Sequence, residues 1–383
     1  MPVLNKISLR HSNAPENTWT EIASGIRILV KLQKSIREFT SDVQTFSEVA
    51  EHADILHRRL GNNLNRYNTP PVYFCEIDNG FISPRLFRHP RHWLIGNDKH
   101  FVDDFLNSTW MNSVPAGISV KPAGDDDSID VKLGQAIHFN QPVLFLNMFS
   151  NTNHLLHESL PALLYLKEIM HEHPEYVVYS SHVKPFIKRF LYDIGFPVQR
   201  MFEGYETTIT APKILVSCFA GGGHLNNPTS TLEDTCSMIS ELLPRMYMPG
   251  DTPERIFVSR SDATQRRLLN EQEISEYLVK SHNFKVIIPG HMSIAQQVEY
   301  FARASIVIGP HGMGINNFAF ARSPKLLIEL FQPNWVREAY LRQAQIKGAS
   351  YAAYIGKLID GNLSVDRAQF ADFFEKCLSE LPS

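Results

Sequence analysis

The sequence predicts an α/β protein built from two facing Rossmann-like domains with a helical N-terminal extension. Two observations lead to this prediction. The chain has 383 residues, which is more than a single hydrophobic core usually supports. From about residue 141 to residue 331, short apolar runs rich in branched residues alternate with stretches of helical length. This alternation is typical of parallel strands joined by crossover helices.

Residues 1–69 are rich in charged residues and helix formers, and we expect one or two amphipathic helices there. Such helices would serve most simply as an adapter or dimerisation surface. Between Pro70 and about Asp130 the sequence has short β-like runs interrupted by proline and glycine. We therefore place the start of the first Rossmann-like domain at residue 70.

The first domain, residues 70–246, is predicted from a regular alternation that begins after Gln141. Strands are expected at 143–147, 176–180 and 213–217, with helices between them at 154–170 and 184–195. The next stretch, 247–253, is polar and contains proline and glycine. We expect a hinge between the two domains there.

The second domain, residues 247–345, has clearer signals. Strands are expected at 255–259, 284–289, 305–309 and 325–331. Helices are expected to begin at Asn270, at Ser293 and after the glycine-rich loop that follows residue 309. Glu273 and Gln296 have the spacing of a capping box in the first two of these helices. Residues 346–383 are predicted to form a helical tail.

The loop Gly309-Pro310-His311-Gly312-Met313-Gly314 follows a buried strand and precedes an apolar segment. Its glycines would let a ligand approach the backbone closely. The unpaired N–H groups and the dipole of the next helix favour an anion, above all a phosphate. The order of glycines matches neither the dinucleotide fingerprint nor the Walker P-loop. The alternative is a plain tight turn in which His311 bonds within the protein.

Two further residues favour a ligand site at the same edge of the predicted sheet. Arg260 follows the strand 255–259, and Glu329 lies inside an apolar strand near its carboxyl end. A buried carboxylate needs a partner, and a ribose diol would supply two hydroxyl donors. The alternative partner for Glu329 is a nearby cation such as Arg322. Together these features predict a site for a nucleoside diphosphate.

Four motifs occur in a fixed order over about residues 140–335. They are Asn151-x-x-His154-x-x-x-Glu158-x-Leu160-Pro161, Ser259-Arg260-x-Asp262-Ala263-x-x-Arg266-Arg267-x-x-Asn270-Glu271, Gly309-Pro310-His311-Gly312-x-Gly314-x-x-Asn317 and Ile328-Glu329-Leu330. In order and spacing these motifs resemble those of glycosyltransferase family 61. The sequence departs from the family pattern at Met313, Glu158 and Ala162, where the family usually has Ala, Asp and Arg.

The resemblance implies an inverting glycosyltransferase of the GT-B type, with an acceptor domain at 70–246 and a nucleotide-sugar domain at 247–345. The donor is expected to be a UDP-sugar. The acceptor is expected to be a glycan or lipid-linked glycan in the synthesis of capsule, exopolysaccharide or lipopolysaccharide. The residues expected to bind the nucleotide sugar are Arg260, Arg266, His311, Gly312, Gly314, Asn317 and Glu329.

The catalytic base is expected at His154 or Glu158, which are four residues apart and so share one face of the predicted helix. One would take the proton of the acceptor hydroxyl and the other would orient it. Glu158 is favoured because it aligns with the acidic residue of the family. The alternative is that both residues only cap and solvate the start of a helix.

Asn151 and His224 are expected to line the acceptor cleft, although the loop Gly221–His224 has the composition of a flexible turn. Tyr205 and Trp335 are candidates for stacking on the sugar or base, but aromatic residues more often pack in a core.

No cofactor and no metal are expected, because Arg260, Arg266, His311 and a helix start would meet the charge of the leaving diphosphate. The run Asp125–Asp127 contains the Asp-x-Asp spacing of metal-dependent transferases, but it lies in a Gly/Asp/Ser loop. The His154-x-x-His157-Glu158 pattern differs from both common zinc-protease patterns.

A net charge of −3 gives no basic field for nucleic acid. The four cysteines have no paired spacing, and no segment approaches the roughly 20 apolar residues that span a membrane. We therefore expect a cytoplasmic protein. Peripheral association with the inner face of the membrane and homo-oligomerisation through the N-terminal helices are compatible with this expectation.

Two other function classes stay open at this point. One is a catalytically silent nucleotide-sugar-binding or scaffold protein. The other is a nicotinamide oxidoreductase, which the lack of a GxGxxG motif disfavours.

Overall fold

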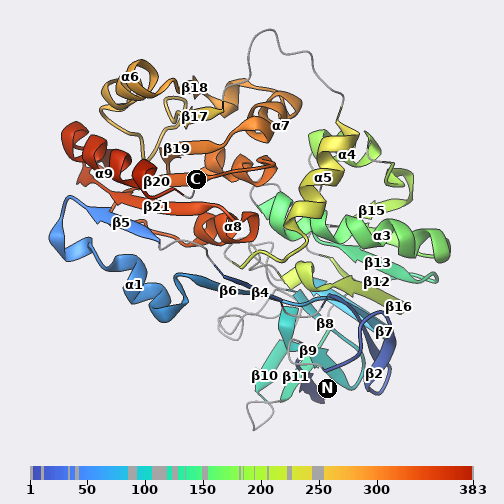
Figure 1. Ribbon diagram of the computed structural model, residues 1–383. Helices are drawn as coiled ribbons and strands as arrows, with labels where there is room; N and C mark the ends of the chain where they lie inside the picture. The colour runs from blue at the N-terminus through green and yellow to red at the C-terminus, as the bar shows by residue number, and fades with distance from the viewer. Residues whose placement is uncertain are drawn as a thin grey trace. The chain divides into compact units, whose positions relative to one another are not determined.

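The computed structural model describes residues 3–9, 13–32, 35–38, 43–84, 93–105, 119–122, 128–133, 135–148, 154–180, 183, 185–193, 195–204, 207–221, 227–243 and 254–381. The chain divides into two compact α/β units (Figure 1). Unit 1 comprises residues 1–35 and 70–225, and unit 2 comprises residues 36–69 and 226–383. Each unit is described by itself below.

Unit 1 is built on a mixed sheet. Its strands are β1 (Val3–Ile7), β2 (Trp19–Ala23), β3 (Ile26–Leu32), β7 (Val72–Pro84), β8 (Trp93–Gly96), β9 (His100–Val102), β10 (Ser119–Pro122), β11 (Ser128–Lys132), β12 (Ala136–His138), β13 (Val143–Leu146), β14 (Val177–Ser180), β15 (Met201–Glu203) and β16 (Thr208–Ser217). Its helices are α3 (Leu160–Glu172) and α4 (Pro185–Asp193). The strand order is β10-β11-β1-β9-β8-β7-β16-β13-β14-β15.

The Rossmann-like part of unit 1 is its run of parallel strands β16-β13-β14-β15. All four residues of β13 are buried, as expected of a parallel strand covered on both faces. The predicted strands at 143–147, 176–180 and 213–217 are therefore confirmed. The short β-like pieces expected after Pro70 instead include one 13-residue strand, β7, which pairs antiparallel with β16.

Unit 2 is built on a fully parallel sheet of six strands in the order β18-β17-β19-β20-β21-β5. These strands are β5 (Gln44–Ser47), β17 (Arg255–Val258), β18 (Lys285–Ile287), β19 (Ile306–Pro310), β20 (Leu326–Phe331) and β21 (Ser350–Ile355). Two small ribbons pair β4 (Ser35–Glu38) with β6 (Arg66–Thr69), and β22 (Lys357–Ile359) with β23 (Asn362–Ser364). The helices are α1 (Ile55–Leu60), α5 (Leu232–Leu242), α6 (Glu271–His282), α7 (Ile294–Arg303), α8 (Ala339–Lys347) and α9 (Arg367–Ser379).

The predicted helical N-terminal extension is wrong for the residues described. Most of residues 3–47 that are described form strands, and α1 is a single short helix. Figure 1 shows β5 in blue beside β21 in red, so a segment from the start of the chain completes the sheet formed by its end. Helix α5, which we placed in the first domain, belongs to unit 2. The predicted hinge at 247–253 lies outside the described residues.

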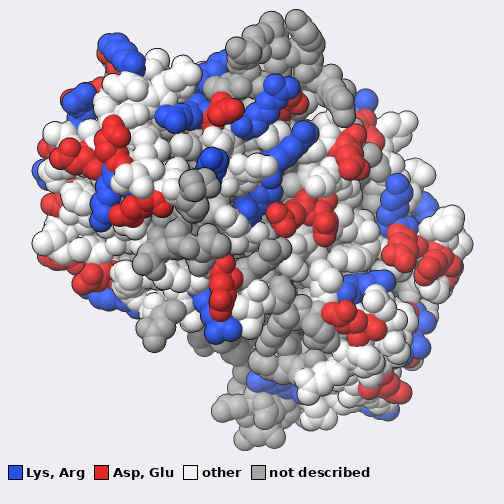
Figure 2. Space-filling view, viewed as in Figure 1, with Lys and Arg blue, Asp and Glu red and all other residues white. Residues whose placement is uncertain are grey.

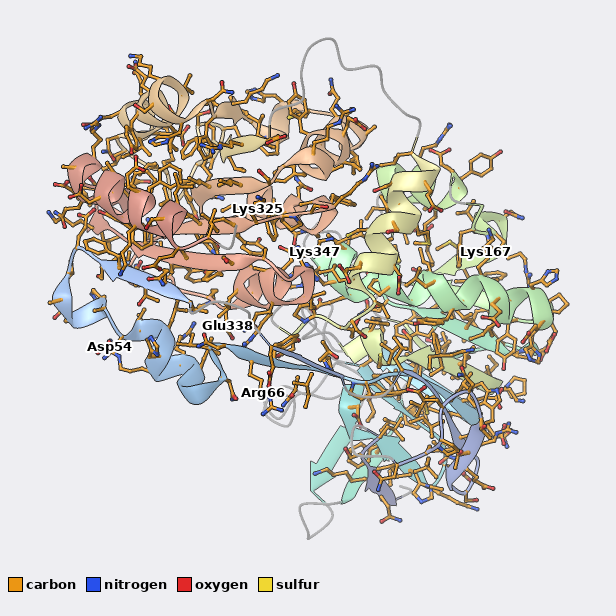
Figure 3. All side chains as sticks on the ribbon, in the orientation of Figure 1. Asp54, Arg66, Lys167, Lys325, Glu338 and Lys347 are labelled. Carbon is orange, nitrogen blue, oxygen red and sulfur yellow. The ribbon has the colours of Figure 1, made fainter. Side chains whose placement is uncertain are left out.

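The segment 36–69 is hydrogen-bonded to side chains of α8 at largely buried positions. Arg342 donates from Nη1 to the carbonyl of Asn63 at 2.9 Å, and Gln345 donates from Nε2 to the carbonyl of Leu64 at 2.6 Å. Glu338, at the start of α8, lies 3.5 Å from Arg59 of α1, and Figure 3 labels it beside this segment. This part of the chain is thus an integral layer of unit 2.

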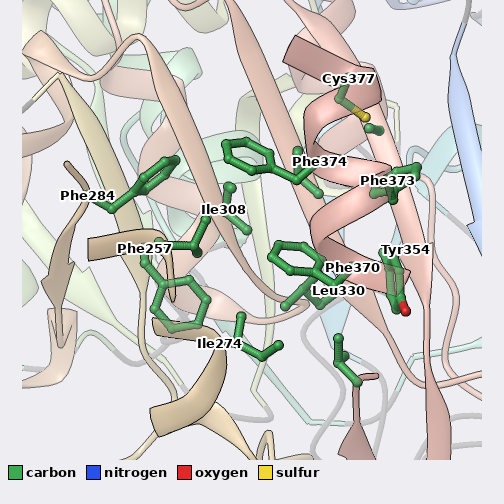
Figure 4. Packing of buried hydrophobic residues seen from close by; sticks show 14 of the residues in the cluster. Phe257, Ile274, Phe284, Ile308, Leu330, Tyr354, Phe370, Phe373, Phe374 and Cys377 are labelled. Carbon is green, nitrogen blue, oxygen red and sulfur yellow. The ribbon is translucent and has the colours of Figure 1, made fainter. Parts of the chain in front are cut away.

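The core of unit 2 joins the sheet to α9. Phe257, Ile308 and Leu330 from the strands pack with Phe370 and Phe374 from the helix (Figure 4). Burying one such side chain contributes about 1.5–3 kcal/mol. The predicted helical tail at 346–383 is therefore wrong in part, because it contains β21 and because α9 covers the core.

Two smaller predictions about unit 2 have opposite outcomes. Ser293 and Gln296 form the predicted capping box at the start of α7. Asn270 caps no N–H of α6, because its Oδ1 accepts from the Val365 amide at 3.2 Å. The helix expected after the glycine-rich loop is a 3-10 helix, Met313–Phe320.

Candidate functional site

The strand order of unit 2 creates a switch point between β17 and β19. The chain leaves β17 to form β18 on one side and returns to form β19 on the other. Connections on opposite sides of neighbouring parallel strands leave a crevice outside their carboxyl ends, where ligands bind in open α/β sheets. Arg260 follows β17 and His311 follows β19, so the sequence places both at this crevice.

Arg260 and Gly312 are in close contact at the switch point. A Cβ atom added to Gly312 would lie 1.6 Å from Nη1 of Arg260. A side chain at residue 312 would therefore displace the guanidinium, which packs against the bare Cα of Gly312. Arg260 donates to the carbonyls of Arg266 at 3.3 Å and Gln265 at 3.1 Å. Burial, and then the nearby charge of Arg266, lowers the pKa of Arg260.

The loop after β17 is shaped by residues of the same sequence motif. Glu271 accepts from the Arg260 amide at 3.0 Å and from the Ser259 hydroxyl. Arg266 has a φ of 54°, which is rare for a residue with a side chain. These contacts fix the backbone that carries Arg260 and Arg266, which explains why the motif extends from Ser259 to Glu271.

His311 is held rigidly between aromatic rings. Its Nδ1 lies 2.7 Å from Oε1 of Glu329. Its ring stacks on Phe331 with centroids 5.1 Å apart and lies 5.3 Å from the ring of Tyr340. The hydroxyl of Tyr340 donates to the carbonyl of Gly312 at 3.0 Å, so α8 also positions the glycine-rich loop.

In this structure the partners of Glu329 are protein groups, and the predicted ribose diol is not among them. The side chain of Glu329 is 0% exposed. Its Oε1 faces His311, and its Oε2 accepts from the Tyr351 hydroxyl at 2.6 Å. Both oxygens are thus occupied inside the protein, and the alternative partner, Arg322, is not among them. Glu329 thus contacts His311, which lines the pocket, and does not line the pocket itself.

A small pocket with a cavity volume of about 10 Å³ lies beside His311 and is lined by Arg266, Pro310, His311, Leu330, Gln332, Trp335 and Leu363. The guanidinium carbon of Arg266 lies 5.0 Å from the centre of the Trp335 ring, and that of Arg337 lies 4.3 Å from it. Trp335 is 42% exposed. Two guanidinium groups thus lie over the Trp335 ring beside the pocket, and their positive charge suits an anion.

Gly314 and Asn317 have contacts inside the protein that account for them. A Cβ on Gly314 would lie 2.7 Å from Cγ1 of Val258. Asn317 donates from Nδ2 to Gln297 of α7 at 2.7 Å. Both residues hold the 3-10 helix against its neighbours, and their predicted contact with the ligand stays a prediction.

In unit 1, His154 and Glu158 form the predicted pair. Nδ1 of His154 lies 2.7 Å from Oε2 of Glu158, whose side chain is 0% exposed while that of His154 is 16% exposed. The residues span a π-helical turn, Leu155–Ser159, directly before α3. Such turns are frequent at functional sites. His154 makes no side-chain cap, so the capping alternative does not explain it.

This turn is tied to the carboxyl ends of two strands of unit 1. The Ser159 hydroxyl donates to the carbonyl of Asn147, just after β13, at 3.0 Å. Asn147 donates from Nδ2 to the carbonyl of Ala220, just after β16, at 2.9 Å. The pair therefore stands at the sheet edge where ligands of parallel strands bind.

Comparison with known proteins decides the family. A family model described as Glycosyltransferase 61 matches residues 99–328, which is more than half of the chain. The chain belongs to glycosyltransferase family 61. Membership confirms the resemblance and assigns the protein to the enzymes that transfer a sugar from a nucleotide-sugar donor to a glycan acceptor.

The other comparisons add little. Among solved structures, E. coli heptosyltransferase WaaC with ADP is 12% identical with a TM-score of 0.29, and the likeness covers 62% of this chain and 98% of that chain. No curated protein matches the sequence.

The family 61 match includes His154, Glu158, Arg260 and His311 and ends one residue before Glu329. Several residues of the pocket and its support lie beyond it and were missed by sequence reasoning. These are Gln332, Arg337, Tyr340, Tyr351 and Leu363. The weak signal for Tyr351 was the buried acid at Glu329, which needed a second donor.

Several candidates of this family 61 chain fall outside the described residues. They are Asn151, His224, Tyr205 and the run Asp125–Asp127.

Among the residues that are described, no group of three or more His, Cys, Asp or Glu side chains could hold a metal ion. No described helix has the length and apolar character needed to cross a membrane. On the face shown in Figure 2, acidic and basic side chains are interspersed.

Proposed function

We propose that this family 61 protein is an inverting, metal-independent glycosyltransferase whose nucleotide-sugar donor binds at the carboxyl edge of the unit 2 sheet. The observation that carries the proposal is the contact of Arg260 with Gly312 at the switch point, beside His311 and Arg266. Two guanidinium groups and an imidazole around one loop suit a diphosphate.

The start of the 3-10 helix supports the same ligand. Its first backbone hydrogen bond runs from the Ile315 amide to the carbonyl of Gly312 at 3.2 Å. The loop that carries His311 thus leads directly into a helix start, whose local dipole favours an anion. The pocket beside His311 brings Arg266 and Trp335 next to this loop.

For catalysis we propose His154 as the base and Glu158 as its orienting partner, which reverses our preference from the sequence. Glu158 is fully buried, whereas His154 is partly exposed. In the reaction, the acceptor oxygen attacks the anomeric carbon, the bond from that carbon to the diphosphate breaks, and His154 takes the proton of the acceptor hydroxyl. Arg260, Arg266 and His311 stabilise the negative charge of the leaving diphosphate.

The donor is proposed to be a UDP-sugar, and the acceptor a glycan or lipid-linked glycan in surface polysaccharide synthesis. Both proposals rest on the resemblance of the sequence motifs to the family. We also propose that the protein works in the cytoplasm, at or near the inner face of the membrane, where such acceptors are available.

The test is thermal unfolding with UDP, GDP, CDP and ADP, followed by transfer assays with the matching nucleotide sugars. At least one nucleoside diphosphate should raise the melting temperature, and turnover should persist in EDTA. Arg260→Ala should abolish the thermal shift. Arg303→Ala is the matched control, because Arg303 is 61% exposed on α7 and pairs with Glu299.

The results separate the alternatives. An unchanged shift in Arg260→Ala would remove the donor site proposed here. A thermal shift without sugar transfer or donor hydrolysis would instead indicate a catalytically silent nucleotide-sugar-binding protein.

A further inference from the structure

Tyr351 lies next to the proposed donor site without touching the pocket beside His311. It is 1% exposed on β21, and its hydroxyl donates to Oε2 of Glu329 at 2.6 Å. Oε1 of Glu329 faces His311 at 2.7 Å. The three residues form a chain of hydrogen bonds that begins inside the sheet and ends at the pocket.

This chain fixes which nitrogen of His311 carries a proton. Burial, and then the charge of Glu329, holds the pKa of Tyr351 well above its usual value. Tyr351 is therefore a hydrogen donor at any working pH, and it occupies one carboxylate oxygen. The other oxygen accepts from Nδ1–H of His311. Neutral His311 then has a lone pair on Nε2.

Nε2 is the polar atom that His311 can offer to a ligand. The ring lines the pocket, and no hydrogen bond among the described residues uses Nε2. A diphosphate has only acceptor oxygens at neutral pH, so a lone pair on Nε2 would repel it. Contact requires a proton on Nε2, which makes His311 an imidazolium.

The charged groups around His311 explain why this proton would arrive with the ligand. Glu329 on β20 favours the imidazolium, while Arg266 in the same pocket and Arg260 beside Gly312 oppose it. Tyr351 stays neutral, and the hydroxyl of Tyr340 on α8 is bonded to the carbonyl of Gly312. A bound diphosphate would offset the two arginines and leave the attraction of Glu329 dominant.

We propose that Tyr351 is a positioning residue of the donor site, and that a nucleoside diphosphate binds with uptake of one proton at Nε2 of His311. The inference rests on the proposed function, because it assumes that the diphosphate lies against His311. It adds a residue outside the family match and a measurable proton to that proposal.

The test is isothermal titration calorimetry at pH 8 in HEPES and in Tris, whose ionisation enthalpies differ. The titrant is the nucleoside diphosphate that stabilises the wild-type protein. If the ligand brings a proton to Nε2 of His311, the observed binding enthalpy of the wild-type protein should differ between the two buffers in proportion to the protons taken up. His311→Gln should take up none.

Tyr351→Phe should reduce the proton uptake and weaken binding about fivefold, the usual effect of losing one hydrogen bond. The donor KM should rise more than turnover falls. Tyr354→Phe is the matched control on the same strand, because the hydroxyl of Tyr354 donates to Glu48 at 2.7 Å, away from the pocket. It should leave both affinity and proton uptake unchanged.

Glu329→Gln provides a second variant of nearly the same shape if Tyr351→Phe does not fold, and it should also lose the proton uptake. Wild-type affinity and uptake in Tyr351→Phe, or wild-type binding without uptake, would overturn this inference while leaving the donor site intact. Failure of the wild-type protein to bind any of the four nucleoside diphosphates would overturn both proposals.

Discussion

Two histidine–glutamate pairs, one in each unit, share a contact and differ in how the chain makes it. In both, a histidine Nδ1 lies 2.7 Å from a carboxylate oxygen, and the glutamate side chain is 0% exposed. His154 and Glu158 are four residues apart on one helical turn. His311 and Glu329 are 18 residues apart, at the ends of the neighbouring parallel strands β19 and β20.

The comparison shows that the surroundings, and not the pair itself, set the chemistry. A buried carboxylate that accepts from Nδ1–H leaves Nε2 basic in either pair. His311 lies beside Arg260 and Arg266, so we propose that its Nε2 meets an anion as an imidazolium. For His154 we propose that the same nitrogen takes a proton from the acceptor. The same arrangement would thus make one histidine a general base and the other a hydrogen-bond donor to an anion.

The largest effect that separates the pairs is expected from replacing the two histidines. His154→Ala should lower turnover by about 10²–10⁴-fold, the usual contribution of a general base, and should leave the dissociation constant of the nucleoside diphosphate unchanged. His311→Ala should raise that dissociation constant. Steady-state kinetics and calorimetry on both variants measure the difference. If His154→Ala weakens diphosphate binding as strongly as His311→Ala does, the two pairs do not have the separate roles proposed here.

The next largest effect concerns the two glycines of the loop after β19. In Gly312→Ala the new Cβ would overlap the guanidinium of Arg260, which must then move. Losing one charge-assisted hydrogen bond weakens binding by about 10–100-fold. Gly314→Ala serves for comparison, because its Cβ would instead overlap Val258 in the core and cost about 1–3 kcal/mol of stability.

Calorimetry and urea unfolding of the two glycine variants test this assignment. Gly312→Ala should lose affinity with little loss of stability, whereas Gly314→Ala should lose stability. Equal affinities for the two variants would place the diphosphate away from Arg260.

The sequence was informative wherever the contact is local or follows from the parallel topology. Branched apolar runs located β13, β17, β19 and β20 to within one or two residues, because strands buried on both faces carry a strong pattern. Helical spacing predicted the contact of His154 with Glu158. Parallel strands end at one edge, so the positions of Arg260 and His311 after their strands predicted that both lie at the same edge of the sheet.

Long-range pairing could not be predicted in this way. The strand β5 has the polar sequence Gln-Thr-Phe-Ser, and it is placed by its pairing with β21. The role of Glu329 depends on Tyr351, 22 residues away on the next strand. The buried acid showed that Glu329 needs partners. Only the register of the sheet shows that these partners are a histidine and a tyrosine, and not a ribose or Arg322.

The smallest expected effect is on the free energy of unfolding at high pH. It tests the hydrogen bond from the Tyr351 hydroxyl to Glu329, which the pair of His154 and Glu158 lacks. Burial raises the pKa of Tyr351 in the folded protein, whereas an unfolded tyrosine ionises near pH 10. Above pH 10 the unfolded chain therefore binds fewer protons, and the free energy of unfolding falls as the pH rises. The stabilisation by the protonated Tyr351 is fully present well below pH 10. At pH 10.5 its partial loss lowers the free energy of unfolding by about 0.8 kcal/mol relative to pH 8.

Urea unfolding of the wild-type protein and Tyr351→Phe at pH 8 and pH 10.5 measures this contribution. The variant has no hydroxyl to ionise at residue 351, so its stability should fall by about 0.8 kcal/mol less than that of the wild-type protein between the two pH values. The same difference in stability at both pH values would mean that the hydroxyl of Tyr351 is not held protonated against Glu329. The chain of hydrogen bonds to His311 would then lack its fixed end, and the second pair would differ from the first only in its arginines.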